Sequence, residues 1–357
     1  MDIGKIIRRM AAKWHPIAYL FIPVIRTKDR LEGGNMHREL EEALRTHCTP
    51  AEQGDAAWLR RTKRDMWYSF LLYHTNFNEY FMFLFPRLSH EARAEFVTEA
   101  EKNELCENMS PPEVWERVWD KWSAYQLFGR YYRRDALKLD GDTPLGDFLA
   151  FTEKHPRFIA KPRLESCGVG VAIYDTSASG NAPEALFARL RDLDVICEEL
   201  IVQAEPLSGL HPGSVNTVRA ATLVKDGAPV LLFTFLRIGR GNSVVDNGGA
   251  GGYVALIDAD AGIVSTPGVT ETHETALLHP DTGAQILGLR LPRWEELKAL
   301  ALELAMVYPQ HPYISWDLAL TDRGWVVVEA NCMGQFIGPQ FTTEHGIRGY
   351  LSRYFDL

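Results

Sequence analysis

Three oxygen-bearing side chains near the end of the sequence have the types and spacing of a magnesium site. Glu329 and Asn331 close the apolar run 325–328, and because they are two residues apart they project from the same face of a strand. Asp317 lies on the preceding apolar run and could stand beside them. Carboxylate and carboxamide oxygens suit Mg²⁺, which takes other ligands from water and substrate phosphates. The alternative is that these residues only cap loops at strand ends.

A second candidate site combines a lysine at the end of a strand with a loop of small residues. Residues 157–162 predict a short buried strand that carries Lys161, and the loop containing Ser166, Cys167 and Gly168 leads to a second apolar run. Such a hairpin can cradle phosphate oxygens, because glycine permits close approach and backbone amides donate. The pattern is neither the GxxxxGK[ST] loop nor a GxGxxG helix start, and an ordinary turn is the alternative.

The elements that would position these residues are strands joined by short turns. Thr-Asp-Arg-Gly connects residues 316–320 to residues 325–328, and this combination predicts two adjacent strands. Asp226-Gly227, between two alternating runs, predicts a hairpin. An amphipathic helix is expected from residue 291 to about residue 308, leading back to the strands of the magnesium site.

The first third of the chain is predicted to be mainly helical. Residues 67–85 hold nine aromatic side chains, which form either a stacking platform for sugars or bases or, as we favour, a buried helical core. Ser89 is expected to cap a helix that runs through Leu105, and Ser110 to cap the next one. That next helix should turn apolar side chains toward the core: Trp115, Val118, Trp119 and Trp122.

Length and composition indicate a globular protein of about two domains. The chain has 357 residues, of which 46% are hydrophobic and 24% charged. A net charge of -9 argues against general nucleic-acid binding, which needs a basic surface. The five scattered cysteines lack CxxC spacing, so we expect reduced thiols in a cytoplasmic protein rather than disulfides or a zinc site.

The first thirty residues are basic, with seven Lys/Arg against two Asp/Glu. Four of these cations precede the apolar run 17–25: Lys5, Arg8, Arg9 and Lys13. The run is far shorter than the roughly 20 residues of a membrane-spanning helix, and no signal-peptide cleavage site follows it. No transmembrane segment is therefore expected. The segment could touch an anionic membrane surface, although packing against the rest of the fold is the favoured interpretation.

The order and spacing of the motifs between residues 120 and about 340 resemble the ATP-grasp superfamily, which includes D-alanine–D-alanine ligases and ribosomal-protein glutamate ligases. In that superfamily a lysine after Asp and a second in a Lys-Pro strand contact the nucleotide phosphates, which implies these roles for Lys121 and Lys161. The loop from Ser166 through Cys167 and Gly168 would cover the phosphates. It departs from the D-alanine ligase pattern at Ser166 and Gly168, where Gly and Ser are usual, so amide contacts are implied rather than a hydroxyl contact.

The resemblance also implies an adenine hinge and a ribose contact. The hinge is a strand ending in Glu198, and backbone groups of Glu199, Leu200 and Ile201 would read adenine. A carboxylate seven residues after the hinge Glu holds the ribose hydroxyls in the superfamily, and Glu205 has that position. A solvated strand-end Glu is the alternative for both carboxylates.

Similarity to the glutamate ligases implies a catalytic group beyond the hinge. Arg219 and Arg237 would hold a transferring phosphate or a substrate carboxylate, and Asn247 would lie beside the γ-phosphate. The glycine run after Asn247 could instead be a flexible connection. The counterparts of the three predicted magnesium ligands bind two Mg²⁺ ions that bridge the phosphates, and Mn²⁺ could substitute.

Within the superfamily, the segments 211–219 and 316–321 are most similar to the sugar-transfer-associated ATP-grasp group, often linked to polysaccharide assembly. The expected fold is α+β, with two α+β ATP-grasp subdomains that grip ATP. We expect a mainly helical region at residues 1–110, a small subdomain at 111–200 with the phosphate-covering hairpin, and a large subdomain at 201–357 with the metal site.

The function implied by this resemblance is that of an ATP-dependent carboxylate–amine ligase. ATP would phosphorylate the carboxylate of a small molecule or glycan, and an amine would attack the acyl phosphate and release phosphate, in polysaccharide or secondary-metabolite assembly. The alternatives are a sugar or polyol kinase with the same Mg-ATP site and a nucleotide-binding protein without catalysis. A kinase should offer a base near the acceptor, and Asp246 is the candidate.

Overall fold

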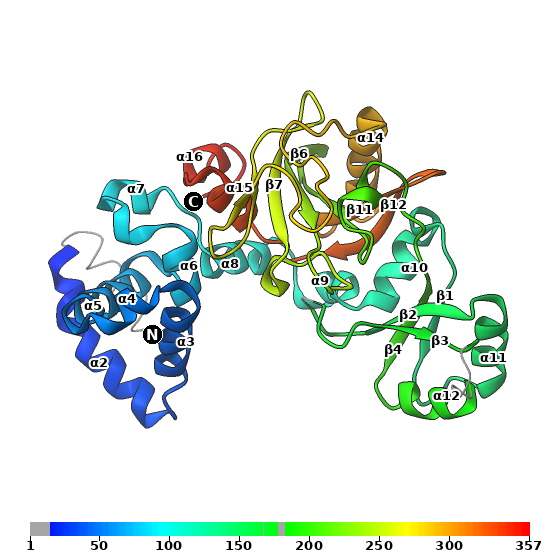
Figure 1. Ribbon diagram of the computed structural model, residues 1–357, viewed down its shortest axis with the longest axis horizontal. Helices are drawn as coiled ribbons and strands as arrows, with labels where there is room; N and C mark the ends of the chain where they lie inside the picture. The colour runs from blue at the N-terminus through cyan, green and yellow to red at the C-terminus, as the bar shows by residue number, and fades with distance from the viewer. Residues whose placement is uncertain (1–14, 167, 178–182) are drawn as a thin grey trace. The chain divides into compact units, whose positions relative to one another are not determined.

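A computed structural model describes residues 15–166, 168–177 and 183–357 (Figure 1). Backbone contacts divide the chain into two compact units, which are described separately. The helical unit comprises the chain up to residue 105 with residues 271–274 and 335–357, and the sheet unit comprises residues 106–270 and 275–334. The α+β class and the helical start of the chain are as predicted, whereas the predicted boundaries at residues 110 and 200 stay predictions.

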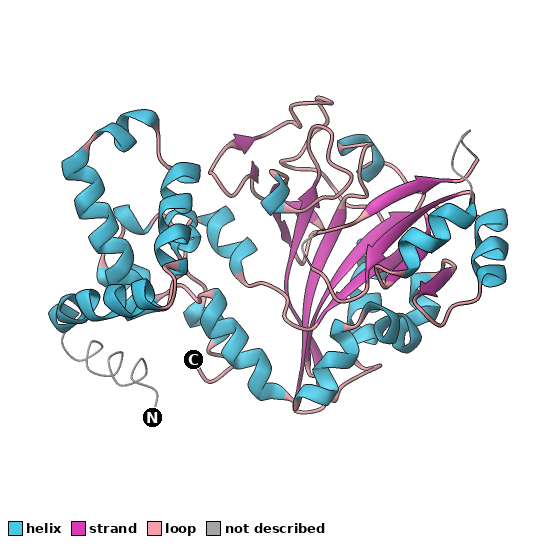
Figure 2. Ribbon diagram, turned by 90° about the horizontal axis from the view of Figure 1, so that it is seen from below, coloured by secondary structure: helices cyan, strands magenta, loops and turns pink. Residues whose placement is uncertain are grey.

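The helical unit is built from short helices, drawn in cyan in Figure 2. Their bounds are η1 His15–Ile17, α2 Ala18–Leu31, α3 Asn35–His47, α4 Pro50–Gly54, α5 Ala56–Tyr73, α6 Phe77–Met82, η2 Phe85–Arg87, α7 His90–Ala94, α15 Ile337–Thr343 and α16 Arg348–Leu351; α8, Glu99–Met109, begins in this unit. Among the described residues, no helix combines the length and hydrophobicity needed to cross a bilayer.

The aromatic segment 67–85 forms the core of the helical unit, as favoured from the sequence. Its buried members are Trp67, Tyr68, Phe77, Tyr80, Phe81, Phe83 and Phe85. The rings pack edge to face and offset, with Trp67 5.2 Å from Phe77 and Phe83 4.7 Å from Phe96 between ring centroids. These rings are inside the core, which supports the favoured prediction over the alternative of a stacking platform.

The helix expected from Ser89 through Leu105 is interrupted. The Ser89 hydroxyl accepts a hydrogen bond from the Ala92 amide and caps only α7, which ends at Ala94. A new helix, α8, begins at Glu99. The prediction of one continuous helix was therefore wrong, because the four residues between Ala94 and Glu99 lie outside both helices.

The helix expected after Ser110 also differs from the prediction. Ser110 does not cap it, since its hydroxyl bonds with the ring of buried His311 at 2.7 Å. The helix, α9 (Pro112–Trp119), ends before Asp120, whose carboxylate caps α10 (Lys121–Tyr132). Because the chain turns at Asp120, Trp119 remains 40% exposed and does not join the core.

The sheet unit contains a small antiparallel sheet with strand order β1-β4-β2-β3 (Figure 1). Its strands are β1 Ala136–Leu139, β2 Arg157–Pro162, β3 Ala172–Asp175 and β4 Val195–Glu199, and its helices are α11 Leu145–Lys154 and α12 Pro183–Arg191. Phe148, Phe158 and Phe187 pack between the helices and the strands. The predicted Lys161 strand and hinge strand are thereby confirmed as the adjacent strands β2 and β4.

The larger antiparallel sheet of this unit has the order β10-β9-β7-β6-β5-β11-β12, with β8 paired to β7. Its strands are β5 Thr217–Lys225, β6 Ala228–Ile238, β7 Tyr253–Asp258, β8 Ile263–Val264, β9 Gly268–Val269, β10 Thr275–Ala276, β11 Tyr313–Thr321 and β12 Gly324–Asn331; the remaining helices are α13 Leu207–Leu210, η3 Gly248–Ala250 and α14 Trp294–Ala305. Helix α14 packs against the strands β5, β6, β11 and β12. The two predicted hairpins, β5–β6 and β11–β12, are both present.

The register of the large sheet sets charged residues opposite one another. Asp317 on β11 pairs with Arg219 on one side and with Glu329 on the other. Thr217 pairs with Arg237 on the next strand. Since directly opposed residues project from the same face of a sheet, this register collects both arginines and both carboxylates there.

A close backbone approach after β12 yields a stability prediction. A Cβ on Gly334 would lie 2.1 Å from the Ser315 Cβ, so Gly334→Ala should destabilise the protein by about 1–3 kcal/mol through overpacking. Gly129→Ala is the matched control, because nothing lies within 4 Å of its Cβ position in α10, and it should be neutral or stabilising by up to about 1 kcal/mol. Urea unfolding of both variants measures the difference, and equal stabilities would contradict the packing of Gly334.

Candidate active site

A cavity of about 370 Å³ in the sheet unit gathers most of the predicted site residues. Those that line it are Lys121, Lys161, Ser166, Gly168, Glu198, Glu199, Leu200, Ile201, Arg237, Asn247, Asp317 and Glu329. Cys167 lies outside the described residues, and among the described lining residues Arg219, Glu205 and Asn331 are missing. The cavity therefore joins the hinge and Lys161 of the small sheet and Lys121 of α10 to the charged strands of the large sheet.

The Asp317 carboxylate is buried between two arginines. Arg219 donates to both of its oxygens, at 2.7 and 2.6 Å, and Arg237 donates to Oδ2 at 2.7 Å. Burial alone would raise the pKa of Asp317, but the two guanidinium groups outweigh burial and lower the pKa to about 2. The arginines are thus held in place by a permanently ionised carboxylate.

Glu329 has a different environment from Asp317. Its side chain is 35% exposed and faces the cavity, and its closest cation is the Lys121 ammonium at 3.5 Å. Lys121 also donates to the Glu165 carbonyl in the phosphate-loop segment. The first helix residue of α10 therefore connects the predicted metal strand with the predicted phosphate loop.

The donor set fits a magnesium ion, with unequal contributions. A carboxylate offers about four acceptor positions, and Asp317 accepts three hydrogen bonds from arginines and one from Asn331, so a metal bond to Asp317 would replace one of these. The Asn331 amide nitrogen donates to the Ser315 carbonyl at 3.3 Å and to Asp317 Oδ2 at 3.4 Å. The Asn331 amide oxygen therefore points away from these two acceptors. Glu329 is the carboxylate best able to hold Mg²⁺.

A second buried carboxylate, Glu198, organises the hinge. Its Oε2 accepts from Lys161 at 3.0 Å and from Arg134 at 2.6 and 2.9 Å. Burial raises the pKa of Glu198, but Arg134 and then Lys161 outweigh burial and lower it to about 2. Lys161 is thereby directed from β2 toward the hinge that the sequence predicts for adenine.

Arg134 is a residue that the sequence analysis missed. Besides Glu198, its guanidinium donates to the carbonyls of Val327 and Val328 on β12. It therefore ties the hinge of the small sheet to the strand that carries Glu329. No local signal could have identified it, because its partners lie 64 and more than 190 positions away in the chain.

Gly168 lets two loops that line the cavity approach each other closely. Gly168 in the predicted phosphate loop has a φ of +76°, and a Cβ there would lie 3.3 Å from the Val245 side chain. Val245 and its neighbours Asp246 and Asn247 line the cavity. The two loops thus meet at Gly168, where a larger residue would hold them apart.

Glu205, the predicted ribose contact, is exposed and turned toward Gly209, where its carboxylate would lie 2.9 Å from an added Cβ. The nearby residues that do line the cavity are Gln203 and Ser208. Gln203 is engaged by the backbone and side chain of buried Asn216. The role of Glu205 stays a prediction.

Asp246 is buried at the edge of the cavity, where both of its oxygens have partners. Oδ2 accepts from the amide and hydroxyl of Thr217, and Oδ1 lies 3.3 Å from Arg237. Burial raises the pKa of Asp246 and the Arg237 charge opposes this shift. Asp246 therefore fixes the start of β5 to the loop that follows β6.

A serine–histidine pair beside the cavity was also not foreseen. His211 Nε2 lies 2.9 Å from the Gly241 carbonyl, which only accepts, so this nitrogen carries the proton and Nδ1 is the acceptor. Ser214, which lines the cavity, must then donate its hydroxyl proton to Nδ1 at 2.9 Å. Gly239 makes room, since a Cβ there would lie 2.1 Å from the Ser214 hydroxyl.

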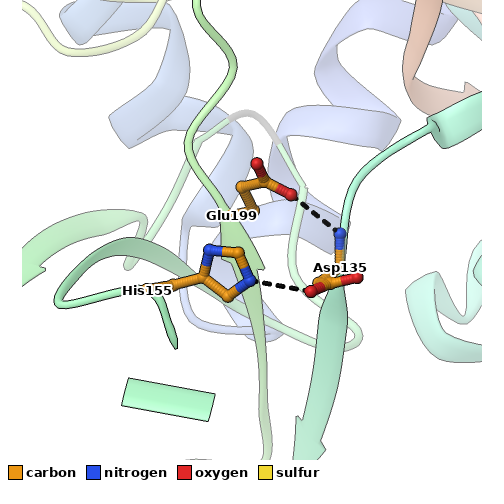
Figure 3. Close-up of side chains that lie close together, drawn as sticks. All are labelled: Asp135, His155 and Glu199. Atoms are coloured by element: carbon orange, nitrogen blue, oxygen red, sulfur yellow. Dashed lines mark hydrogen bonds and ion pairs between the residues drawn. The ribbon is translucent and has the colours of Figure 1, made fainter. Parts of the chain in front are cut away.

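A third cluster, Asp135, His155 and Glu199, offers three potential ligand atoms close together (Figure 3). Asp135 already pairs with the Lys154 ammonium and with His155 at 2.8 Å, and hydrogen bonds from Lys154 and then His155 lower the pKa of Asp135. The Glu199 carboxylate accepts from the Asp135 amide at 3.1 Å. These contacts brace the start of β1 against the end of the hinge strand.

The buried Glu198 predicts a pH dependence of stability. Its folded-state pKa is lowered below the usual 4.3 or so, so its stabilising contribution is complete above about pH 5 and is lost as the pH falls toward 2. Glu198→Gln has no titrating group there and should show a shallower loss of unfolding free energy between pH 5 and 3. Urea unfolding across this range gives the free energy of unfolding of both proteins as a function of pH. Parallel curves would show that the ionisation of Glu198 contributes nothing to stability.

The two carboxylates of the predicted metal site should respond differently to neutralisation. Asp317→Asn leaves buried Arg219 without its carboxylate partner and Arg237 with Asp246 alone, and it should cost about 3 kcal/mol or more of the free energy of unfolding. Glu329→Gln removes only a part-exposed ion pair and should cost less than about 1 kcal/mol. Denaturant unfolding at pH 7 compares them, and an equally stable Asp317→Asn variant would refute the anchoring role of Asp317.

Comparison with solved structures gives remote likenesses. The D-alanyl-alanine synthetase A of Vibrio cholerae is 15% identical, with a TM-score of 0.42 over 68% of this chain and 66% of that one. The ATP-grasp ligase PsnB complexed with a minimal precursor is 12% identical, with a TM-score of 0.42 over 74% and 68%. The D-cycloserine synthetase DcsG is 15% identical, with a TM-score of 0.40 over 70% and 76%.

The family assignment rests on sequence. A comparison with curated proteins found no match. A family model described as sugar-transfer associated ATP-grasp matches residues 147–354. This match covers more than half of the chain, including the hinge, the arginine strands and the Asp317–Asn331 hairpin. The chain therefore belongs to the sugar-transfer-associated ATP-grasp family.

Proposed function

We propose that the protein is an ATP-dependent carboxylate–amine ligase that forms an acyl phosphate and releases ADP and phosphate. The observation that supports this most directly is the pair of arginines held on Asp317, with Arg237 lining the same cavity as the hinge and both lysines. Planar guanidinium groups bind carboxylates and phosphates in two-point contacts. Arg237 would thus hold an acceptor carboxylate beside the nucleotide, with Arg219 supporting it through the shared Asp317.

In the proposed reaction a carboxylate oxygen attacks the γ-phosphorus of ATP, and the bond to the bridging oxygen breaks to release ADP. Lys121 and Lys161 would neutralise phosphate charge, while Arg219 and Arg237 would orient the carboxylate and share the charge of the transferring group. Magnesium, held mainly by Glu329 with one contact each from Asp317 and Asn331, would add charge neutralisation at the phosphates. Asn247 would lie beside the γ-phosphate.

In the second step the amine nitrogen bonds to the acyl carbon, and the carbon–oxygen bond to phosphate breaks. The attacking amine must lose a proton. Ser214 and His211 suit this task, since the serine hydroxyl already donates to Nδ1. Ser214 would take the amine proton while its own proton moves to His211, and the Gly241 carbonyl would stabilise the resulting imidazolium.

The alternative is a sugar or polyol kinase with the same nucleotide site. A kinase with Asp246 as its base would need a carboxylate oxygen available to the acceptor hydroxyl. Thr217 donates two hydrogen bonds to Oδ2, and Oδ1 pairs with Arg237, so an acceptor hydroxyl would have to compete with Arg237 for that oxygen. This contact set favours the ligase. The family description supports a sugar-containing acceptor, so we propose a glycan or small-molecule carboxylate in polysaccharide or secondary-metabolite assembly.

Trapping the intermediate tests the ligase proposal. Protein, ATP and Mg²⁺ are incubated with hydroxylamine and a panel of uronic acids and amino acids, and ADP and hydroxamate are measured. A ligase should release ADP and yield a hydroxamate with its own carboxylate, because hydroxylamine captures acyl phosphates. Glu329→Gln is the control and should lower both products at least about a hundredfold if it removes a metal ligand worth several kcal/mol.

The same assay distinguishes the rival functions. A phosphomonoester without hydroxamate, obtained with neutral sugars or polyols, would establish the kinase. AMP and pyrophosphate would contradict both reactions. ATP binding without any product across the panels would favour a nucleotide-binding protein that is not catalytic.

A further inference from the structure

Helix α2 of the helical unit, drawn in blue in Figure 1, carries exposed apolar side chains that form a stripe along one face, here called its outer face. Leu20, Val24 and Leu31 occupy positions i, i+4 and i+11, which share one side of an α-helix. They are 67%, 59% and 83% exposed. Thr27 continues the stripe, and its hydroxyl is satisfied internally by the Pro23 carbonyl at 2.8 Å.

This stripe is separate from the face by which α2 joins the core. The opposite side of the helix buries Ala18 and Ile22, and Tyr19 stacks on Tyr68 with ring centroids 4.6 Å apart. The helix therefore has one apolar face that packs against α5 and a second that packs against nothing in the described part of the chain. Of the large apolar side chains that are strongly exposed in the described helical unit, Leu357 alone lies outside α2.

Cations flank the stripe on both sides. Lys28 and Arg30 lie about 80° to either side of it at 100° per residue, and both are exposed. Arg64 of α5 extends the positive charge past Tyr19, with its guanidinium 4.2 Å above that ring. Asp29, within this helix, is buried and accepts from the amides of Met36 and His37, so it faces inward. Glu32, just past the helix, is exposed and lies 3.8 Å from Lys28, an exposed ion pair that is worth little in water.

The charge of this end contrasts with the rest of the chain. The first thirty residues carry seven Lys/Arg and two Asp/Glu, a net charge of +5, whereas the whole chain carries -9, which leaves -14 for the remainder. Such asymmetry points to an anionic partner for the basic end. Because apolar side chains lie between the cations, that partner must accept both kinds of contact, as the headgroup region of a bilayer does.

From this we infer that the outer face of α2 binds an anionic lipid surface, with Leu20, Val24 and Leu31 entering the headgroup region and Lys28 and Arg30 facing the lipid charges. A second copy of the chain is a poorer occupant. In a symmetric pairing through this stripe, the flanking cations of the two copies would lie near one another and repel. A bilayer needs no complementary shape and supplies the negative charge.

Cosedimentation with vesicles tests the inference on the full chain. Binding is measured with vesicles of phosphatidylcholine and phosphatidylglycerol (70:30) and with phosphatidylcholine alone, at low and high salt. We expect binding to the mixed vesicles that weakens with salt and little binding to the neutral ones. Lys28→Gln with Arg30→Gln should lower the partition coefficient about thirtyfold, since each cation near an anionic surface contributes about fivefold.

The apolar contribution is tested with Leu20→Ser and Leu31→Ser together, which should also lower binding at least tenfold, because each side chain loses several buried methyl or methylene groups. The matched control is Leu277→Ser with Leu278→Ser in the sheet unit, where the side chains are 58% and 56% exposed. All these positions are exposed, so thermal unfolding should be unchanged, and a shift would mark a misfolded variant.

Three results would overturn the inference. The α2 variants could bind vesicles as the unaltered chain does, or neutral vesicles could bind equally well. The third is a concentration-dependent dimer that Leu20→Ser with Leu31→Ser abolishes in the absence of vesicle binding, which would assign the stripe to a second copy. None of these results depends on the reaction catalysed. The vesicle test can therefore overturn the membrane inference without affecting the ligase proposal, and the trapping assay can overturn the ligase proposal without affecting the membrane inference.

Discussion

The sheet unit depends on neutralising carboxylates that its folding buries. Glu198 and Asp317 are both removed from water, and an unpaired buried carboxylate would cost several kcal/mol. Arg134 and Lys161 balance the first, and Arg219 and Arg237 balance the second. The first group lies at the small sheet and the second on the large sheet, and Arg134 joins the two sheets beside the cavity by donating to the Val327 and Val328 carbonyls.

The same pairings arrange the groups that the proposed reaction needs. Arg219 and Arg237 are long, flexible side chains, and a shared carboxylate holds them in one position before any substrate arrives. Arg134 connects the hinge to β12 through the Val327 and Val328 carbonyls. Stability and pre-organisation of the site therefore come from one set of buried charges, and Glu329 is left as the part-exposed carboxylate that faces the cavity.

The helical unit is assembled from segments that are far apart in the sequence. Segments from three parts of the chain build it, and Gln340 of α15 exchanges two hydrogen bonds with the backbone of Val97, 243 positions away. Arg348 likewise pairs with Glu101. The unit thus folds around its own aromatic core, while its α2 helix retains an apolar face that the described chain does not cover.

The sequence by itself determined the elements whose signal is local. Alternation, turn residues and the spacing of Glu329 and Asn331 identified the hairpins, and aromatic density identified the helical core, because neighbouring residues fix periodicity and turn geometry. Only the tertiary structure decided how distant charges pair. The hydrogen bonds that only the tertiary structure decided are Arg134–Glu198, Asp246–Thr217, Ser110–His311 and His211–Ser214. Each depends on how the backbone brings its two partners together, which the local sequence pattern does not specify.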